Sequence, residues 1–279
     1  MPSITELLID LGLANYVVGR TGFCIHPADQ VARIPKIGGT KDVNIGKIRA
    51  LRPTHVIVNV DENEKPTVDT LRAYIPYIVV THPLTPEDNL ALIDQLFDAF
   101  FELLKNSISA IDNIAACALS ISSKALKSEI SQRLRTLQTH HPRVQPERVL
   151  YLIWKDPWIS VARDTYISRM LHLVDWQTLP DLQGGNGISA PGAARYPVLL
   201  GNEVWLRDVD RVLLPSEPYR FSLAHIAQVQ QWLPHAKVQL VDGEMLSWYG
   251  SRAVAGLDYL AALAGWVTSA DASTKATSS

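Results

Sequence analysis

The chain has 279 residues, of which 47% are hydrophobic and 19% are charged, and its formal net charge is −2. This composition is that of a globular chain with enough residues for one large core or two smaller lobes, and the slight negative charge makes nucleic acid an unfavourable main partner. No uninterrupted apolar run is long enough to cross a bilayer. The two cysteines, Cys24 and Cys117, have no metal-ligand spacing and are expected to be free thiols, with a pairing as the alternative.

The first part of the chain predicts an α/β lobe. A helix is expected from Ser3, because Ser3-Ile4-Thr5-Glu6 has the form of a capping box and Gly12 follows as a stop. Continuous β-branched runs of strand length separated by a helix predict a parallel βαβ unit. The expected elements are a short strand at Tyr16–Gly19, a helix at Ile45–Leu51, a strand at His55–Val60, a helix at Pro66–Tyr74 and a strand at Tyr77–Thr81.

The middle of the chain predicts two long helices. No proline lies between Pro86 and Pro142, and apolar residues recur there at helical spacing. A single helix over that run would extend about 80 Å, whereas a compact chain of this length has a radius of gyration of about 19 Å. We therefore expect a break near Asn106–Ser107, followed by a helix of roughly 30 residues that can join two lobes.

The last part of the chain repeats the order of the first. Strands are expected at Arg148–Trp154, Arg211–Leu214 and Lys237–Val241, and helices at Thr165–Leu173, Leu223–Trp232 and Ser251–Ala264. The predicted fold is therefore α/β, with two α/β lobes that have largely parallel sheets and are joined by one long backbone helix. The expected parts are a first lobe over 1–85, a helical linker over 86–142, a second lobe over 143–267 and a disordered tail over 268–279.

Aromatic residues at the end of a strand suggest a ligand surface in the second lobe. Trp154 and Trp158 lie at the carboxyl end of the apolar run that begins at Arg148, and all seven tryptophans lie at or beyond residue 154. Ligands of open α/β sheets bind outside the carboxyl ends of the strands, where indoles offer flat surfaces for an aromatic or macrocyclic ligand. The alternative is that these tryptophans belong to the core or to an interface between lobes.

Two further segments contain candidate binding residues. After the last strand, Trp248 and Tyr249 offer stacking surfaces and Arg252 offers a charge, with a helix cap and ordinary packing as the alternative. His26 lies on a loop before Pro27 and could face a cleft or act as an axial ligand to a metal centre. A structural, hydrogen-bonded histidine is the more common role at such a place.

No motif indicates catalysis. The chain has no nucleophile elbow, no phosphate-binding glycine loop, no H-x-x-x-H pair and no carboxylate pair placed for acid–base work, so we expect no catalytic residue and no resident metal site. Acidic turns stand at equivalent places in the two halves, with Glu62 and Glu64 in the first and Glu217 in the second. They suggest two negative tips that dock on a basic partner, with ordinary solvated loops as the alternative.

Taken together, these segments resemble a known family. Over about residues 2 to 265 the chain is similar to the helical-backbone, or class III, substrate-binding proteins of ABC importers, and most like the cobalamin-binding branch. The segments that carry the resemblance are Pro2-Ser-Ile-Thr-Glu-Leu-Leu, Val17-Val-Gly19, Phe23-Cys-Ile-His-Pro27, Gly38-Gly-Thr-Lys41, Asn59 through Asn63, Tyr151 through Trp158, Leu214 through Pro218 and Val241 through Arg252.

The resemblance implies a non-enzymatic, monomeric protein that holds a corrinoid, haem or ferric siderophore and delivers it to an ABC importer permease. Such a protein is periplasmic or at the cell surface and meets the membrane only through the permease. Phe23 and Trp248 match places where the family stacks a macrocycle, and Asn63 and Arg252 would orient the ligand. Glu62 or Glu64 would dock the first lobe. The second docking glutamate would fall near Gly250–Ser251, which are not acidic, so Glu217 is the candidate there.

The resemblance also raises an expectation about the amino end. Family members begin with a β-strand ahead of the Pro-Ser-x-Thr-Glu segment, and secreted ones have a signal before it. The sequence here starts at that segment, so the first sheet should have an unpaired edge, and an upstream extension should raise the melting temperature. A cytoplasmic relative, a cytosolic protein that handles metal chelates and a ligand-less interaction module are the competing interpretations.

Overall fold

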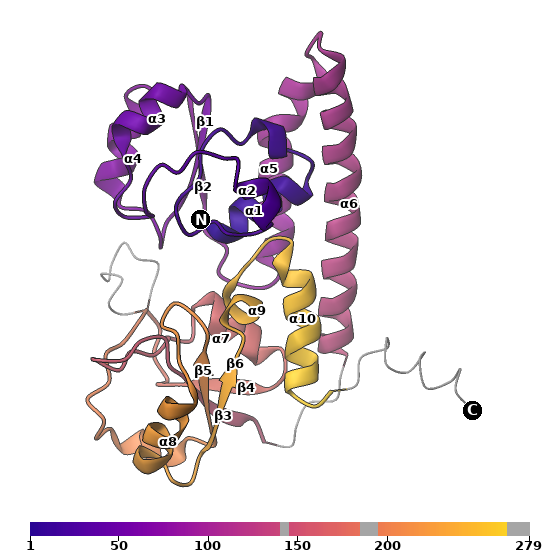
Figure 1. Cartoon of the computed structure of the whole chain (residues 1–279). Helices are drawn as coiled ribbons and strands as arrows, with labels where there is room; N and C mark the ends of the chain where they lie inside the picture. The colour runs from indigo at the N-terminus through magenta and orange to yellow at the C-terminus, as the bar shows by residue number, and fades with distance from the viewer. Residues whose placement is uncertain (140–144, 185–194, 267–279) are drawn as a thin grey trace. The chain divides into compact units, whose positions relative to one another are not determined.

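The computed structural model describes residues 1–139, 145–184 and 195–266 (Figure 1). The tail expected at 268–279 lies outside these residues. The chain divides into two compact units: the first comprises Met1–Pro83, Glu87–Ser131 and Tyr249–Arg252, and the second comprises Leu84–Pro86, Gln132–Trp248 and the chain from Ala253 onward. The lobe boundaries expected at 85 and 142 stay a prediction.

The first unit contains a parallel pair of strands surrounded by helices. β1 (His55–Asn59) and β2 (Tyr77–Thr81) pair in register from His55 opposite Tyr77 to Asn59 opposite Thr81, with α4 between them in the chain. The βαβ unit expected from the sequence is thus confirmed. The helices are α1 (Pro2–Asp10), α2 (Ala28–Val31), α3 (Ile45–Leu51), α4 (Lys65–Arg72) and α5 (Asp88–Lys105), with a 3-10 helix at Ala14–Tyr16.

Helices cover both faces of this small sheet (Figure 1). On one face, Val56 and Ile78 pack against a core that includes Ile48 of α3 and Leu71 of α4. On the other face, the ring of His55 lies 5.1 Å from that of Phe100 in α5. Parallel strands with helices on both faces read as continuous apolar runs, and both strands of this pair were predicted from such runs.

The strand expected at Tyr16–Gly19 is wrong. A 3-10 helix occupies Ala14–Tyr16, and Val17–Gly19 forms no strand. Only the next residue, Arg20, forms a bridge, with Lys36. The side chains of this segment are of types that favour strands, and that is why a strand was predicted. A strand also needs a hydrogen-bonded partner along its edge, and one edge of this segment has none.

The break between the two long helices lies where it was expected. α5 ends at Lys105 and α6 runs from Ala110 to Gln138, 29 residues. The hydroxyl of Ser107 donates to Asp112 at 2.6 Å and accepts the amide of Ser109, so short polar side chains satisfy the exposed start of α6. At about 1.5 Å per residue α6 spans about 43 Å, and its residues belong to the first unit through Ser131 and to the second from Gln132.

The second unit has a four-stranded sheet in the order β4-β3-β5-β6, and all its neighbouring strands are parallel. β4 was not predicted from the sequence, because its four residues include Gln177 and Thr178 and show no clear apolar period. The elements are β3 (Glu147–Tyr151), α7 (Tyr166–His172), β4 (Trp176–Leu179), a 3-10 helix (Val204–Asp208), β5 (Arg211–Pro215), α8 (Leu223–Trp232), β6 (Lys237–Val241), α9 (Gly243–Ser247) and α10 (Arg252–Leu263).

The two sheets confirm the predicted fold class, two parallel α/β sheets with one long helix between them in the chain. β5, α8 and β6 repeat the order of β1, α4 and β2, and each strand pair has five parallel residue pairs. Cys24 is buried and Cys117 is exposed, and both are free thiols, as expected. Among the helices of the described residues, none combines the length and the hydropathy needed to cross a membrane.

Candidate functional site

Two neighbouring strand ends position a group of aromatic side chains in the second unit. β3 and β5 are adjacent and parallel, with Tyr151 opposite Leu213. Their carboxyl ends therefore lie at the same edge of the sheet, and the loops that follow them start side by side. The first loop contains Trp154 and Trp158, and the second contains Tyr219 and Phe221.

These loops and α8 form an aromatic cluster, which comprises Trp154, Trp158, Tyr219, Phe221, His225 and Trp232. The ring of Trp154 meets that of Tyr219 edge-on with centroids 5.5 Å apart, and Tyr219 meets Phe221 at 4.7 Å. Trp158 stacks on Phe221 at 6.2 Å and on Trp232 at 5.8 Å. Edge-to-face and offset contacts at these distances stabilise aromatic pairs beyond their buried area, so the cluster holds its rings in fixed orientations.

The cluster has a solvent side and a core side. Trp154 is 43% exposed and Tyr219 is half-buried, whereas Phe221 is 5% exposed and packs in the core of the unit. Trp158 and Trp232 pack against that same core. We call Trp154 and Tyr219 the aromatic rim. The structure thus assigns different surroundings to the two tryptophans that the sequence placed at one strand end.

The imidazole of His225 contacts the phenol of Tyr219. The main-chain amide of Ser222 donates to Nδ1 of His225 at 2.9 Å, as part of the capping box of α8. In the neutral imidazole this places the proton on Nε2, which lies 3.4 Å from the Tyr219 hydroxyl oxygen. The ring can therefore donate a hydrogen bond to that oxygen.

Trp248 and Glu217 contact each other rather than open solvent. Trp248 is 6% exposed, and its indole N–H donates to Oε1 of Glu217, which also accepts the hydroxyl of Ser247 at 3.1 Å. A side chain at Gly243 would meet main-chain atoms of Glu217 at 2.9 Å, so only glycine fits there. The carboxylate of Glu217 thus accepts hydrogen bonds from within the protein. Ligand stacking on Trp248 and docking through Glu217 stay predictions.

The ionised carboxylate of Glu217 should lower the free energy of unfolding at neutral pH. Burial raises its pKa above the usual value, against the opposing hydrogen bonds from Trp248 and Ser247. A raised pKa in the folded state means that the stability contributed by Glu217 is present below the unfolded pKa and is lost as the pH rises through the folded pKa. Glu217→Gln, which keeps the acceptor oxygen, should therefore gain stability relative to the parent between pH 4 and pH 7, as measured by urea midpoints. Glu62→Gln, at an exposed site, is the control, and a relative loss for Glu217→Gln at pH 7 would refute this assignment.

In the first unit, the predicted residues have diverse surroundings. Phe23 is 62% exposed on the loop before α2, and a Cβ on Gly39 would lie 3.7 Å from its ring. His26 is half-buried on the same loop. Asn63 accepts the amide of Asn59 at 2.9 Å and donates to the carbonyl of Thr40 at 2.9 Å, so it joins the end of β1 to the neighbouring loop. Glu62 and Glu64 are exposed on the turn after β1. The ligand-binding and docking roles of these residues stay predictions.

Arg252 has a partner that its sequence context did not show. Its guanidinium donates to both carboxylate oxygens of Glu6, at 2.6 and 3.0 Å, and the two side chains are 16% and 13% exposed. Burial raises the pKa of Glu6, although Arg252 acts in the opposite direction. The Tyr249 hydroxyl lies 3.9 Å from the sulfur of Met1. A bidentate ion pair of this kind fits a structural role for Arg252, and a contact with ligand stays a prediction.

Tyr219 and His225 were not among the site residues predicted from the sequence. Tyr219 follows the acidic turn at the carboxyl end of β5, so the rule that selected Trp154 would also have selected it. The same rule would not have selected His225, because its contact with Tyr219 depends on the hydrogen bonds that cap the start of α8. Among the residues that the structure describes, no three His, Cys, Asp or Glu side chains are grouped so that they could hold a metal ion.

Comparisons with known proteins agree with this architecture. The family model described as periplasmic binding protein matches residues 1–186. The vitamin B12 binding protein BtuF of Vibrio cholerae has a similar structure, with a TM-score of 0.67, 18% identity and coverage of 95% of this chain and 94% of that one.

Two haem-binding proteins have similar folds. The periplasmic heme-binding protein RhuT from Roseiflexus sp. RS-1 aligns with a TM-score of 0.67, 18% identity and coverage of 95% of both chains. The heme-binding protein HutB of Vibrio cholerae aligns at 0.66 with 18% identity, over 94% of this chain and 95% of that one. No curated protein matches the sequence. The family match covers well over half of the chain, so this protein belongs to the periplasmic binding protein family.

Proposed function

We propose that this protein is the solute-binding component of an ABC importer and that its cargo is a flat metal chelate, a corrinoid or a haem, with a ferric siderophore as the related alternative. Family membership supports the solute-binding role, which is one of capture and delivery without chemical change of the cargo. The observation that carries the choice of cargo is the aromatic rim, in which Trp154 and Tyr219 lie at the carboxyl ends of two adjacent parallel strands.

The rim suits a macrocycle for physical reasons. A planar ring system buries a large apolar area when it stacks on an exposed indole, and the position at the strand ends is where open α/β sheets bind ligands. The neighbouring residues along the chain, Lys155 and Arg220, are cationic and match the two propionate groups that a haem bears. Nζ of Lys155 lies 3.4 Å from a carboxylate oxygen of Asp156. An acidic group of the ligand would therefore replace Asp156 as the partner of Lys155.

Tyr219 gives the rim a metal-binding group. A tyrosine oxygen is a known ligand of ferric haem, and Nε2 of His225 lies 3.4 Å from this one, where it can donate a hydrogen bond and help to orient the phenol. The cobalt of a corrinoid has less need of a phenolate, so the contribution of Tyr219 separates the two cargoes. Delivery to a permease would use the exposed acids Glu62 and Glu64 on the first unit, as the family resemblance implies.

The test is a titration of the purified protein with cobalamin, cobinamide, haemin and a ferric siderophore, followed by tryptophan quenching and visible absorbance. We expect saturable binding below 1 μM for one of them, on the order of 8 kcal/mol or more. Trp154→Ala should weaken that binding about fivefold or more, since it removes a stacking surface worth about 1 kcal/mol or more. If haem is the cargo, Tyr219→Phe should change the visible spectrum of the complex, and if a corrinoid is, Tyr219→Phe should leave the spectrum unchanged.

The matched control is Leu223→Ala. Leu223 is 74% exposed at the start of α8, close in sequence to the rim but outside the aromatic cluster. The Leu223→Ala variant should bind the cargo with the same affinity as the parent protein. A folded parent protein that binds none of the four compounds would overturn the metal-chelate proposal and leave an interaction module as the better interpretation.

A further inference from the structure

One face of the first half of α6 is both apolar and exposed. Ile111, Ile114 and Ile121 are 68%, 70% and 69% exposed, and Ile108, in the turn before the helix, is fully exposed. Single exposed apolar residues are ordinary, whereas large ones that recur on one helix face form a patch of the kind that marks an interaction site. The residues of this face are Ala110, Ile111, Ile114, Cys117 and Ile121, all of them exposed, and we call them the isoleucine face.

The isoleucine face contains no charge. From Asn113 to Ser123 the sequence has no acidic or basic residue. The acid just before this stretch, Asp112, accepts hydrogen bonds from the hydroxyls of Tyr16 and Ser107, so it is engaged within the unit. A helix face that only meets solvent is normally rich in charged and polar residues, and solvation therefore does not account for this composition.

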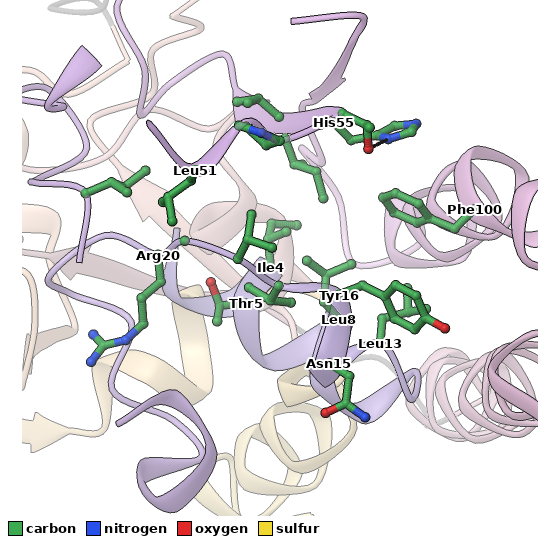
Figure 2. A pocket seen from close by; sticks show the side chains of 18 of the residues that line it. Ile4, Thr5, Leu8, Leu13, Asn15, Tyr16, Arg20, Leu51, His55 and Phe100 are labelled. Carbon is green, nitrogen blue, oxygen red and sulfur yellow. Dashed lines mark hydrogen bonds between the residues drawn. The ribbon is translucent and has the colours of Figure 1, made fainter. Parts of the chain in front are cut away.

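The isoleucine face belongs neither to the core of the first unit nor to its cavity. Another side of α6 enters the core through buried residues such as Ala115 and Leu119, and Lys127 joins the helix to Asp94 of α5. The cavity of this unit, about 600 Å³, lies beside β1 (Figure 2), and among the described residues of α6 only Asp112 lines it. The isoleucine face is thus left for a partner outside the unit.

We infer that the isoleucine face is the contact through which two copies of this protein form a symmetric dimer, with their α6 helices antiparallel and crossing at Cys117. Cys117 comes three residues after Ile114 and four before Ile121, so it lies between them on the same face. A two-fold axis at this point brings Ile114 of each copy beside Ile121 of the other. The small side chain at the crossing lets the two helices approach closely.

Charge decides the orientation of the two helices. Parallel helices would place Lys124 of one copy beside Lys124 of the other, and like charges at such a contact repel. In the antiparallel pair Lys124, seven residues after Cys117, lies opposite Ala110, seven residues before it. The aliphatic stem of the lysine can there cover the apolar end of the face while the ammonium group stays in water.

Other occupants match the isoleucine face less well than a second copy does. Residues 267–279 of the chain include no isoleucine, leucine or aromatic residue, so they offer little apolar surface. Helices that lie on membranes have several cations on their polar face and aromatic residues on the other, whereas residues 106–126 contain one cation, Lys124, and no aromatic residue. A charged protein surface would lose its hydration here without gaining a counter-charge.

The contact is small, so the dimer should be weak. From Ala110 to Lys124 the helix is about 21 Å long, and one helix face of that length buries less than the roughly 800 Å² per partner of a standard interface. We expect a dissociation constant of about 10 to 100 μM, so that the monomer implied by the family resemblance is the form in dilute solution. This inference is independent of the cargo, because the aromatic rim lies in the second unit.

The first test measures the mass of the protein by light scattering between about 1 and about 300 μM. The mean mass should rise with concentration from 30.9 kDa toward twice that value. Ile114→Glu buries a charge in the contact and should weaken association about tenfold or more. Leu223→Glu is the matched control, because Leu223 is 74% exposed but lies on α8, and it should leave association unchanged. Equal urea midpoints for the parent and both variants exclude a loss of folding.

The second test uses the chain's own thiol at the crossing point. Cys117 is exposed and Cys24 is buried, so a short bis-maleimide should join two parent copies through Cys117, and Cys117→Ser should yield no product. In the double variant Ala110→Cys/Cys117→Ser the new thiols should stay unjoined, because antiparallel helices hold them about 21 Å apart along the axis. Parallel helices would place the same thiols side by side.

Three results would overturn the inference. The first is a parent protein that keeps the mass of one chain at the highest concentration, or a dimer that Ile114→Glu leaves intact. The second is crosslinking of the Ala110→Cys/Cys117→Ser variant in place of the parent. The third is binding to vesicles of phosphatidylcholine and phosphatidylglycerol that Ile114→Glu abolishes, since the face would then be a membrane contact.

Discussion

Trp158→Ala is expected to lower the free energy of unfolding of the second unit by about 3 kcal/mol, the usual cost of removing a large aromatic side chain from a packed site. Trp158 stacks on both Phe221 and Trp232, and it packs against the core that includes Leu150 and Val212. Removing it leaves a cavity between two aromatic rings that cannot collapse onto each other. The measurement is the urea midpoint of the variant against the parent.

A comparison with Trp154 separates the two possible roles of these tryptophans. Trp154→Ala removes a side chain that is 43% exposed, so it should cost well under 1 kcal/mol of stability while weakening ligand binding. Trp158→Phe keeps an aromatic ring in the stack and should restore most of the stability that Trp158→Ala loses. If Trp158→Ala left stability unchanged and only weakened binding, the core assignment of Trp158 would be wrong.

Arg252→Met should destabilise the first unit by about 3 kcal/mol at neutral pH, because it leaves the carboxylate of Glu6 buried without its partner. The pKa of Glu6 is already raised by burial, and it should rise further in the variant. A group with a raised folded pKa contributes stability below its unfolded pKa that is lost as the pH rises. The deficit of the variant should therefore shrink as the pH falls from neutrality toward the unfolded pKa of glutamate, about 4.3, measured by denaturation at a series of pH values.

The double variant Glu6→Gln/Arg252→Met distinguishes this structural role from contact with ligand. Neither side chain then bears a charge, so most of the lost stability should return. Binding of the cargo by the double variant should equal that of the parent if Arg252 serves only Glu6. Recovery of stability together with lost binding would show that Arg252 touches the ligand as the sequence suggested.

The elements of the fold were largely predictable because their signals are local. β1 and β2 are continuous apolar runs that lie next to proline or acidic turns, and the helical period between residues 86 and 142 has no proline to interrupt it. The break before α6 followed from length alone, because a single helix would exceed the size of the molecule. The strand at Tyr16–Gly19 failed for a non-local reason, since its pairing edge faces a cavity and not another strand.

The positions of the aromatic residues relative to the strands were predictable from the sequence, but their contacts were not. The amino-acid sequence by itself determined that aromatic residues follow strand ends in the second unit, because strand ends and residue types can both be read from local patterns. Only the tertiary structure decided that Trp154 is exposed while Trp158 packs on the core, that Tyr219 lies beside Trp154, and that His225 contacts Tyr219. It alone paired Glu217 with Trp248, and Arg252 with Glu6, 246 residues away in the chain. Such pairings join residues that are far apart in the sequence and are brought together only by folding, so no local sequence pattern predicts them.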